Sequence, residues 1–322
     1  PKLVYSQDDI FPAYEQTRWF KIKKIRDKNN ITVMAKVKIY GAKEYWCQVP
    51  RIKQGFLGLG HEVVTGDDYD FIYANNFDYE DIDSEHKDSA LYEGESKLVK
   101  KGFKIFNVLD IPPHIKDFPI QKLKDQLSHA DLVTCISDPV KQQLSEIGIE
   151  SNVIYNPIKD IMFDSQTTRE INCLYVGRYF DQNKRFYLLD NIDTYVVGPA
   201  GGSPQVNYLG LVNDVTLNQL YNVSKVVALP SKFEGLGLPA LEAMVAGSVP
   251  LVCKDNPNSE LCPDFCKADP DVDSVTKTYQ DILNNFKDYQ SEILKNFSST
   301  IQHKFSKFSV AKNIMNLYGK NK

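Results

Sequence analysis

The residues with the clearest chemical pattern lie in the segment 231–252, SKFEGLGLPALEAMVAGSVPLV. A glycine-rich loop leads there into an expected helix, which has Pro239 at its first turn and Gly247 at its end. N–H groups at the start of a helix have no partner inside the helix and lie at the positive end of its dipole, so they bind anions. This junction therefore predicts a phosphate site. The amides expected to hold the phosphate are those of Leu236, Gly237 and Leu238.

Two carboxylates flank this loop and predict more than a phosphate. Glu234 precedes the loop and Glu242 lies about one turn into the helix, so both can line one pocket. The missing side chains at Gly235 and Gly237 allow a ligand to approach the backbone closely. A bare phosphate would not favour two carboxylates, whereas a diphosphate with hydroxyl groups on both sides would, because carboxylates accept hydrogen bonds from hydroxyls. The ligand expected is a nucleoside diphosphate that carries a sugar.

The elements that position these residues follow the pattern of an α/β protein. Apolar, strand-like runs alternate with charged, helical segments, which is typical of parallel sheets covered by helices. The strands expected in the first half are 31–37, 61–65, 70–76, 103–110, 132–137 and 152–156. Those expected in the second half are 171–180, 194–198, 206–210, 225–230 and 249–254. The repeated pattern predicts two similar domains.

The domain boundary is expected in the polar, aperiodic segment 157–169. We predict an N-terminal domain over 1–160, completed by the C-terminal helix 305–322, and a second domain over 161–304. A helix is also expected over 138–149, where Asp138 and Pro139 suit a helix start.

Three segments in the second half together resemble a known family. CLYVGRYFDQNK has Gly-Arg at a strand end and a lysine six positions after the arginine, VNYLGLV is a strand followed by Leu-Gly, and EGLGLPALEA contains E-x7-E. In this order, over residues 171–254, they are similar to the retaining glycosyltransferases of family 4 (group 1). That resemblance implies the GT-B fold, in which two Rossmann-like domains face each other across a cleft.

The resemblance also implies roles for individual residues. The enzyme expected is a retaining glycosyltransferase that moves a sugar from a nucleoside diphosphate sugar to an acceptor hydroxyl without a metal, because fixed cations and helix amides stabilise the departing diphosphate. A UDP- or GDP-sugar is expected as co-substrate, and no bound cofactor is expected. The implied roles are Gly177 at the donor-site strand end, Arg178 and Lys184 on the diphosphate, Glu234 on the transferred sugar, Glu242 on the ribose, and Leu211 and Val212 against the base.

The first half matches the family less well. Where family members commonly have a His-Asp pair after the fourth strand, this chain has Leu109 and Asp110. Asp110 is expected either to take an acceptor hydroxyl or to cap the turn in VLDIPP. Gly41 stands where the family's first loop approaches the donor, or it is simply a loop glycine.

Other motifs do not predict a site. The run Gly55-x-x-Gly58-x-Gly60 has the wrong order for a dinucleotide fingerprint and precedes a strand, so we expect a helix end there. Asp-x-Asp occurs at 68/70, 81/83 and 269/271, but the first two pairs lie in acidic loops and the third lacks the glycine and glutamate of a calcium loop. We expect no metal, and we expect the six scattered cysteines to be free thiols.

Charge and hydropathy limit the partners. A net charge of -4 does not supply the positive field needed for general nucleic-acid affinity. No run approaches the roughly 18 apolar residues that span a bilayer, and the first residues lack a signal-peptide pattern, so a cytoplasmic protein is expected. The basic segment 14–28 is expected to contact a membrane surface, to bind the acceptor, or to pack Trp19, Phe20 and Ile25 on its own domain. The acceptor stays open between glycan, lipid, protein and modified nucleic acid.

Two alternative functions agree with a sugar-nucleotide site. A sugar-nucleotide epimerase of the same two-domain architecture also needs a diphosphate site, but it would be expected to carry more acid and base groups. A non-catalytic sugar-nucleotide-binding protein would account for Leu109 in place of the histidine.

Overall fold

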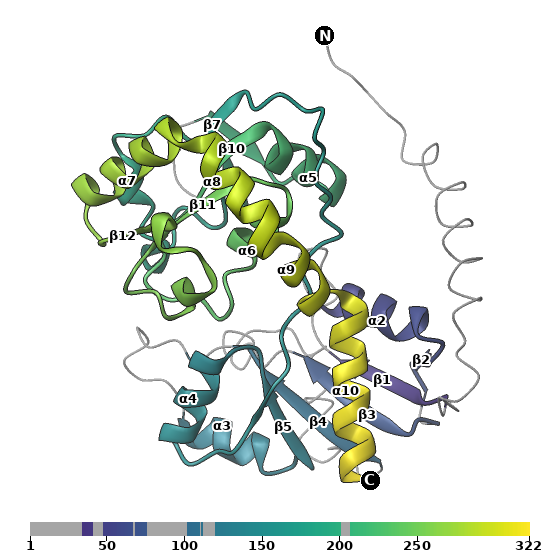
Figure 1. Ribbon diagram of the computed structural model, residues 1–322. Coiled ribbons are helices and arrows are strands. Elements are labelled where there is room, and N and C mark those ends of the chain that lie inside the picture. The colour runs from purple at the N-terminus through teal and green to yellow at the C-terminus, as the bar shows by residue number, and fades with distance from the viewer. Residues whose placement is uncertain are drawn as a thin grey trace. The chain divides into compact units, whose positions relative to one another are not determined.

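The computed structural model describes residues 34–40, 48–66, 68–75, 102–109, 111, 120–200 and 207–322. In this part of the chain two parallel β-sheets form, each with helices between its strands (Figure 1). Strands buried on both faces need continuous apolar runs, and the chain supplies such runs at nearly every expected position. The prediction of two α/β domains with parallel sheets is confirmed.

The first sheet has the strand order β2-β1-β3-β4-β5-β6, and every described pair is parallel. Its strands are β1 (Lys36–Tyr40), β2 (Glu62–Val64), β3 (Phe71–Asn75), β4 (Phe103–Val108), β5 (Leu132–Cys135) and β6 (Asn152–Val153). Its helices are α2 (Val49–Gly58), α3 (Ile120–Leu127) and α4 (Asp138–Glu146). Helix α4 begins where Asp138 and Pro139 predict it, and Ser137 is the N-cap, accepting from the Val140 amide at 3.4 Å.

The second sheet has the order β12-β11-β10-β7-β8-β9 and is also parallel throughout its described pairs. Its strands are β7 (Ile171–Val176), β8 (Tyr195–Val197), β9 (Asn207–Gly210), β10 (Ser224–Leu229), β11 (Val249–Cys253) and β12 (Lys267–Ala268). Its α-helices are α5 (Asp214–Val223), α6 (Leu238–Val245), α7 (Val272–Asn284) and α8 (Phe286–Ile293). Short 3-10 turns lie at η2 (Gln182–Lys184), η3 (Phe186–Leu189), η4 (Pro257–Leu261) and η5 (Asp264–Cys266).

The end of the chain returns to the first sheet. After a π-helical turn, η6 (Leu294–Ser298), and α9 (Ser299–Lys304), helix α10 (Lys307–Asn321) lies beside α2 (Figure 1). Tyr318 of α10 stacks on Phe71 of β3 with 4.4 Å between ring centroids. The buried side chains that α10 adds to the core of this sheet are Val310, Ala311, Ile314 and Tyr318.

The glycine run at 55, 58 and 60 spans the end of a helix, as predicted. Helix α2 ends at Gly58, and a Cβ on Gly55 would collide with the backbone carbonyl of Lys307 in α10. A Cβ on Gly58 would likewise meet the ring of Phe308. The two small residues therefore let α2 and α10 pack closely.

Other sequence predictions have mixed outcomes. The segment 14–28 and the Asp81/Asp83 pair lie outside the described residues. Strand β7 is shorter than the predicted 171–180, because the chain turns after Val176, and the short strand β12 was not predicted. The five cysteines in the described part of the chain are free. None of the described helices is both long enough and apolar enough to cross a bilayer.

Candidate functional site

The glycine-rich loop after β10 ends in the expected loop-to-helix junction. Gly237 is the N-cap of α6 with φ 74°, a left-handed conformation that favours glycine, and Pro239 follows in the first turn. The helix ends before Gly247, which has φ 73°. The first amides of α6 therefore have no acceptor within the helix, as anion binding requires.

A cation and a carboxylate meet in front of this junction. The Lys184 Nζ atom, at the end of η2, donates to Glu234 Oε1 at 2.7 Å, and the Ser231 hydroxyl donates to the same oxygen at 2.6 Å. The side chains of Lys184 and Glu234 are only 16% and 13% exposed. A partly desolvated pair of this kind is stronger than an exposed one. The structure therefore brings together two of the sequence-predicted site residues.

The backbone around this pair is held by side-chain amides that sequence analysis did not identify. The side-chain amide of Asn183 donates to the Phe233 backbone carbonyl at 2.9 Å, and the backbone carbonyl of Asn183 accepts from the Lys232 N–H at 2.8 Å. From η4, the Asn258 amide group donates to the Glu234 carbonyl. These bonds join segments about 50 and 24 residues apart, so only the fold shows them.

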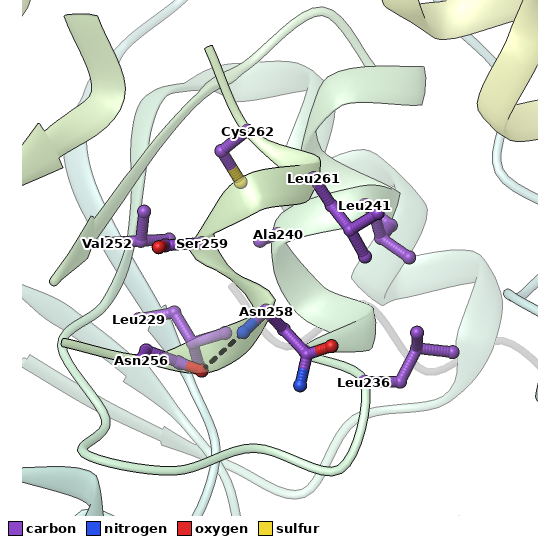
Figure 2. A pocket seen from close by; sticks show the side chains of 11 residues that line it. Leu229, Leu236, Ala240, Leu241, Val252, Asn256, Asn258, Ser259, Leu261 and Cys262 are labelled. Atoms are coloured by element: carbon purple, nitrogen blue, oxygen red, sulfur yellow. Dashed lines mark hydrogen bonds between the residues drawn. The ribbon is translucent and has the colours of Figure 1, made fainter. Parts of the chain in front are cut away.

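A cavity of about 10 Å³ lies behind the loop, between α6 and η4 (Figure 2). Leu236, Gly237, Leu241 and Asn258 are among its lining residues. A volume of this size suits about one water molecule, so the cavity cannot contain a nucleotide sugar. It is part of the packing that supports the loop.

Arg178 lies at the surface beside this cluster. It follows Gly177 at the end of β7, its side chain is 58% exposed, and its Nη2 atom donates to Asp181 at 3.1 Å. Asp181 also accepts from the Asn183 amide at 2.9 Å and so caps η2, the turn that carries Lys184. An exposed pair three residues apart adds little stability, so the Arg178 guanidinium can turn to an anionic ligand at low cost.

Glu242 occupies a different hydrogen-bond network from Glu234. Its side chain is 2% exposed, and each oxygen has a donor: the Lys159 backbone N–H at 3.0 Å and the Tyr221 hydroxyl at 2.9 Å. Burial first, and then the Glu242 carboxylate, raise the pKa of Tyr221 well above its ordinary value, so the phenol stays protonated and donates. A ribose that binds Glu242 must therefore displace Lys159 or Tyr221, or share an oxygen with one of them.

The residues predicted near the base lie in the turn after β9. Leu211 is 60% exposed, whereas Val212 packs partly against the core. Asn213 then caps α5 by accepting from the Thr216 amide at 2.8 Å. An exposed apolar side chain held beside a capped helix is suited to pack on a planar base.

The other residues considered in the sequence analysis lie outside the Lys184–Glu234 cluster or outside the described residues. Gly41 and Asp110 lie outside the described residues, whereas Leu109 is partly buried. Asp68 pairs with Lys36, and Asp269 pairs with Lys254 at 3.0 Å. In the described ranges, no group of three or more His, Cys, Asp or Glu side chains is arranged to bind a metal ion.

Part of the chain matches a known protein family. Residues 163–293 match the family described as glycosyl transferases group 1. An uncharacterized glycosyltransferase of Methanocaldococcus jannaschii is 31% identical over 118 residues, which are 35% of this chain and 30% of that protein. O-antigen chain mannosyltransferase B of Escherichia coli is 48% identical over 50 residues, 16% of this chain and 13% of that protein. The matched segments thus span less than a third of either relative.

Solved structures match over much more of the chain. HepE of Anabaena, solved in complex with UDP and glucose, matches with a TM-score of 0.70 at 15% identity. The match covers 89% of this chain and 100% of the HepE chain. Sucrose-phosphate synthase of Thermosynechococcus elongatus matches with a TM-score of 0.62 at 16% identity. That match covers 78% of this chain and 73% of the synthase chain. At these identities the likeness shows the fold, which is GT-B.

Proposed function

We propose that this chain is a retaining glycosyltransferase that moves a sugar from a nucleoside diphosphate sugar to an acceptor hydroxyl. The observation that carries the proposal is the Lys184–Glu234 pair in front of the first turn of α6. The pair brings a cation and a carboxylate together beside the N-terminus of α6, and we assign the cation to the diphosphate and the carboxylate to sugar hydroxyls. The match of residues 163–293 to group 1 glycosyltransferases supports the same activity.

In the proposed reaction, the acceptor oxygen forms a bond to the anomeric carbon on the face from which the diphosphate leaves. The bond between that carbon and the phosphate oxygen breaks, and the departing oxygen takes the acceptor's proton. Arg178, Lys184 and the amides of 236–238 stabilise the negative charge that develops, so no metal is required. Glu234 holds hydroxyls of the transferred sugar, Glu242 holds the ribose, and Leu211 packs on the base.

This route does not use a protein nucleophile. A double displacement would require a carboxylate under the anomeric carbon, and the N-terminal candidate is Asp110. We propose instead that Asp110 assists the acceptor hydroxyl, so that Asp110→Asn slows transfer less than loss of Arg178 or Lys184. A mass increase of one sugar on the intact protein would contradict this.

The donor is proposed to be a UDP- or GDP-sugar, and solved HepE complexes contain UDP with glucose and UDP-glucose. The test is a thermal-shift screen of the full chain against both classes. A donor at 100 times its dissociation constant should raise the free energy of unfolding by about 2.7 kcal/mol. Cytoplasmic location, and membrane contact through segment 14–28, are further proposals.

A further inference from the structure

Arg185 directly follows Lys184, and the activity proposed above gives it no role. It lies between the 3-10 turns η2 and η3, with φ 48° and ψ 38°. Among the described residues other than glycine, Arg185 alone has a positive φ. A Cβ is disfavoured in this left-handed region, so a residue other than glycine stays there only when its surroundings hold it.

The Arg185 side chain is held by a carboxylate from the loop after β11. Its Nη1 atom donates to Asp255 Oδ1 at 2.9 Å, and its Nη2 atom donates to Asp255 Oδ2 at 2.5 Å. The two side chains are 11% and 37% exposed. Two parallel bonds between a planar guanidinium and a carboxylate fix direction as well as distance. The pair can therefore hold residue 185 in a backbone conformation that an arginine would otherwise avoid.

The backbone of Arg185 determines how η2, the turn that carries Lys184, is placed. The Arg185 N–H donates to the Gln182 carbonyl at 3.2 Å and closes η2, and the Arg185 carbonyl accepts from the Leu188 N–H at 2.9 Å in η3. The two turns thus join at this residue, and its φ and ψ set the angle between them. A shift of about 1 Å in a charged group can remove much of its effect on a ligand, so this angle matters for Lys184.

The loop that supplies Asp255 also contacts the other member of the site pair. Asn256 is the N-cap of η4 and accepts from the Asn258 N–H at 3.1 Å (Figure 2). The side-chain amide of Asn258 donates to the Glu234 carbonyl. One short loop therefore holds the residue after Lys184 through Asp255 and the backbone of Glu234 through Asn258.

We propose that Arg185 and Asp255 are positioning residues of the donor site: their pair holds residue 185 in the left-handed conformation that directs Lys184 to the donor's diphosphate. This inference rests on the proposed function, in which Lys184 stabilises that diphosphate. The two residues act through Lys184 and not on the ligand itself. Glycine, which adopts a positive φ readily, should therefore be able to replace Arg185, whereas alanine should not.

The test measures binding of UDP and GDP to the full chain by calorimetry. Arg185→Ala should bind the preferred nucleoside diphosphate about tenfold more weakly, because alanine keeps the Cβ, loses the pair and spends less time in the binding conformation. Asp255→Ala should cause a similar loss. Arg185→Gly should stay within about threefold of the wild type. Circular dichroism checks the fold of each variant, and Asp255→Asn replaces any alanine variant that does not fold.

A double-mutant cycle separates positioning of Lys184 from a general loss of structure. Combined with Lys184→Ala, Arg185→Ala should weaken binding by less than about twofold further, because the cation that it positions is already absent. Lys104→Ala is the matched control. Lys104 of β4 pairs with Asp131 at 3.3 Å in the first sheet, and their side chains are 18% and 43% exposed, close to the values for Arg185 and Asp255. This variant should keep wild-type affinity for UDP and GDP.

Wild-type affinity in a folded Arg185→Ala variant overturns the positioning role and leaves the proposed function standing. The same holds if Arg185→Gly binds as weakly as Arg185→Ala, or if Arg185→Ala causes its full loss in the presence of Lys184→Ala. A folded wild type that binds neither UDP nor GDP counts against the proposed function itself, and the inference falls with it.

Discussion

At the residue scale, Lys184 and Glu234 each have a partner before any ligand arrives. The two side chains are 2.7 Å apart and little exposed, so each charge neutralises the other where water can do so only in part. Arg178 differs, because its own side chain is 58% exposed although its partner Asp181 is largely covered. The same proposed role, stabilising a diphosphate, therefore has different structural consequences at the two positions.

Lys184→Ala and Arg178→Ala should both slow transfer about 100- to 1,000-fold at saturating donor, as removal of a preorganised donor to a developing anion does. Only Lys184→Ala should also lower the melting temperature, because it leaves Glu234 without its cation. Single-turnover kinetics and thermal unfolding of both variants measure the two effects. Near-normal turnover of either variant would remove that cation from the mechanism.

Glu242→Gln tests a carboxylate whose oxygens are both occupied. Glutamine keeps one oxygen for the Lys159 N–H, and its amide can donate to the Tyr221 hydroxyl, but it removes the negative charge that lies 3.8 Å from Lys159 Nζ, so we expect a loss of about 1–3 kcal/mol in the free energy of unfolding. Donor affinity should fall further than the rate at saturating donor, since a ribose does not react. If donor affinity is unchanged, Glu242 is a structural residue that holds the segment at Lys159.

At the element scale, the sequence predicted most strands and the loop-to-helix junction because hydrophobic runs and turn residues are local signals. Strand β12 was not predicted, because Lys267 and Ala268 are followed by the acidic segment from Asp269 and no apolar run marks the strand. The side-chain contacts of the site could not be predicted from the sequence either. Lys184 and Glu234 are 50 positions apart, and Lys159 and Glu242 are 83 apart, so only tertiary packing brings each pair together.

Helix α10 packs on α2 through Gly55, which gives a matched pair of glycine substitutions. Gly55→Ala should destabilise the protein by about 1–3 kcal/mol, because its Cβ would collide with the Lys307 carbonyl. Gly319→Ala, in α10, should be neutral or stabilising by up to about 1 kcal/mol, since nothing lies within 4 Å of the added Cβ. Urea unfolding measures both changes. Equal effects of the two substitutions would contradict the close packing of α2 and α10.

His61 joins β1 to the end of α2 and gives the first sheet a dependence on pH. Its Nδ1 atom accepts from the Ala35 amide at 3.3 Å, and burial lowers the pKa of His61 below its ordinary value. The folded state therefore binds a proton at His61 less readily than the unfolded state. The stability contributed by the neutral, buried imidazole is fully present above about pH 6.5, and it is lost as the pH falls through the lowered pKa of the folded state. Between pH 7.5 and 5.5, the melting temperature of His61→Gln should fall less than that of the wild type. An equal fall in both proteins would contradict this role.

At the scale of the whole molecule, the GT-B fold gives two parallel sheets, and the described candidate residues concentrate on the second. Fold alone does not separate a transferase from an epimerase or a binding protein, because each can use the same nucleotide site. Only the fate of the bond between sugar and diphosphate separates them.

The most direct test follows that bond by phosphorus and proton NMR while the full chain is incubated with UDP-glucose or GDP-mannose in excess chelator. We predict release of the free nucleoside diphosphate from one of the two donors, slowly to water and faster once an acceptor is supplied, with retained configuration in the glycoside formed. Three results would contradict the central claim: a bound donor that stays intact, an epimerised sugar still attached to its nucleotide, or release that requires a divalent metal.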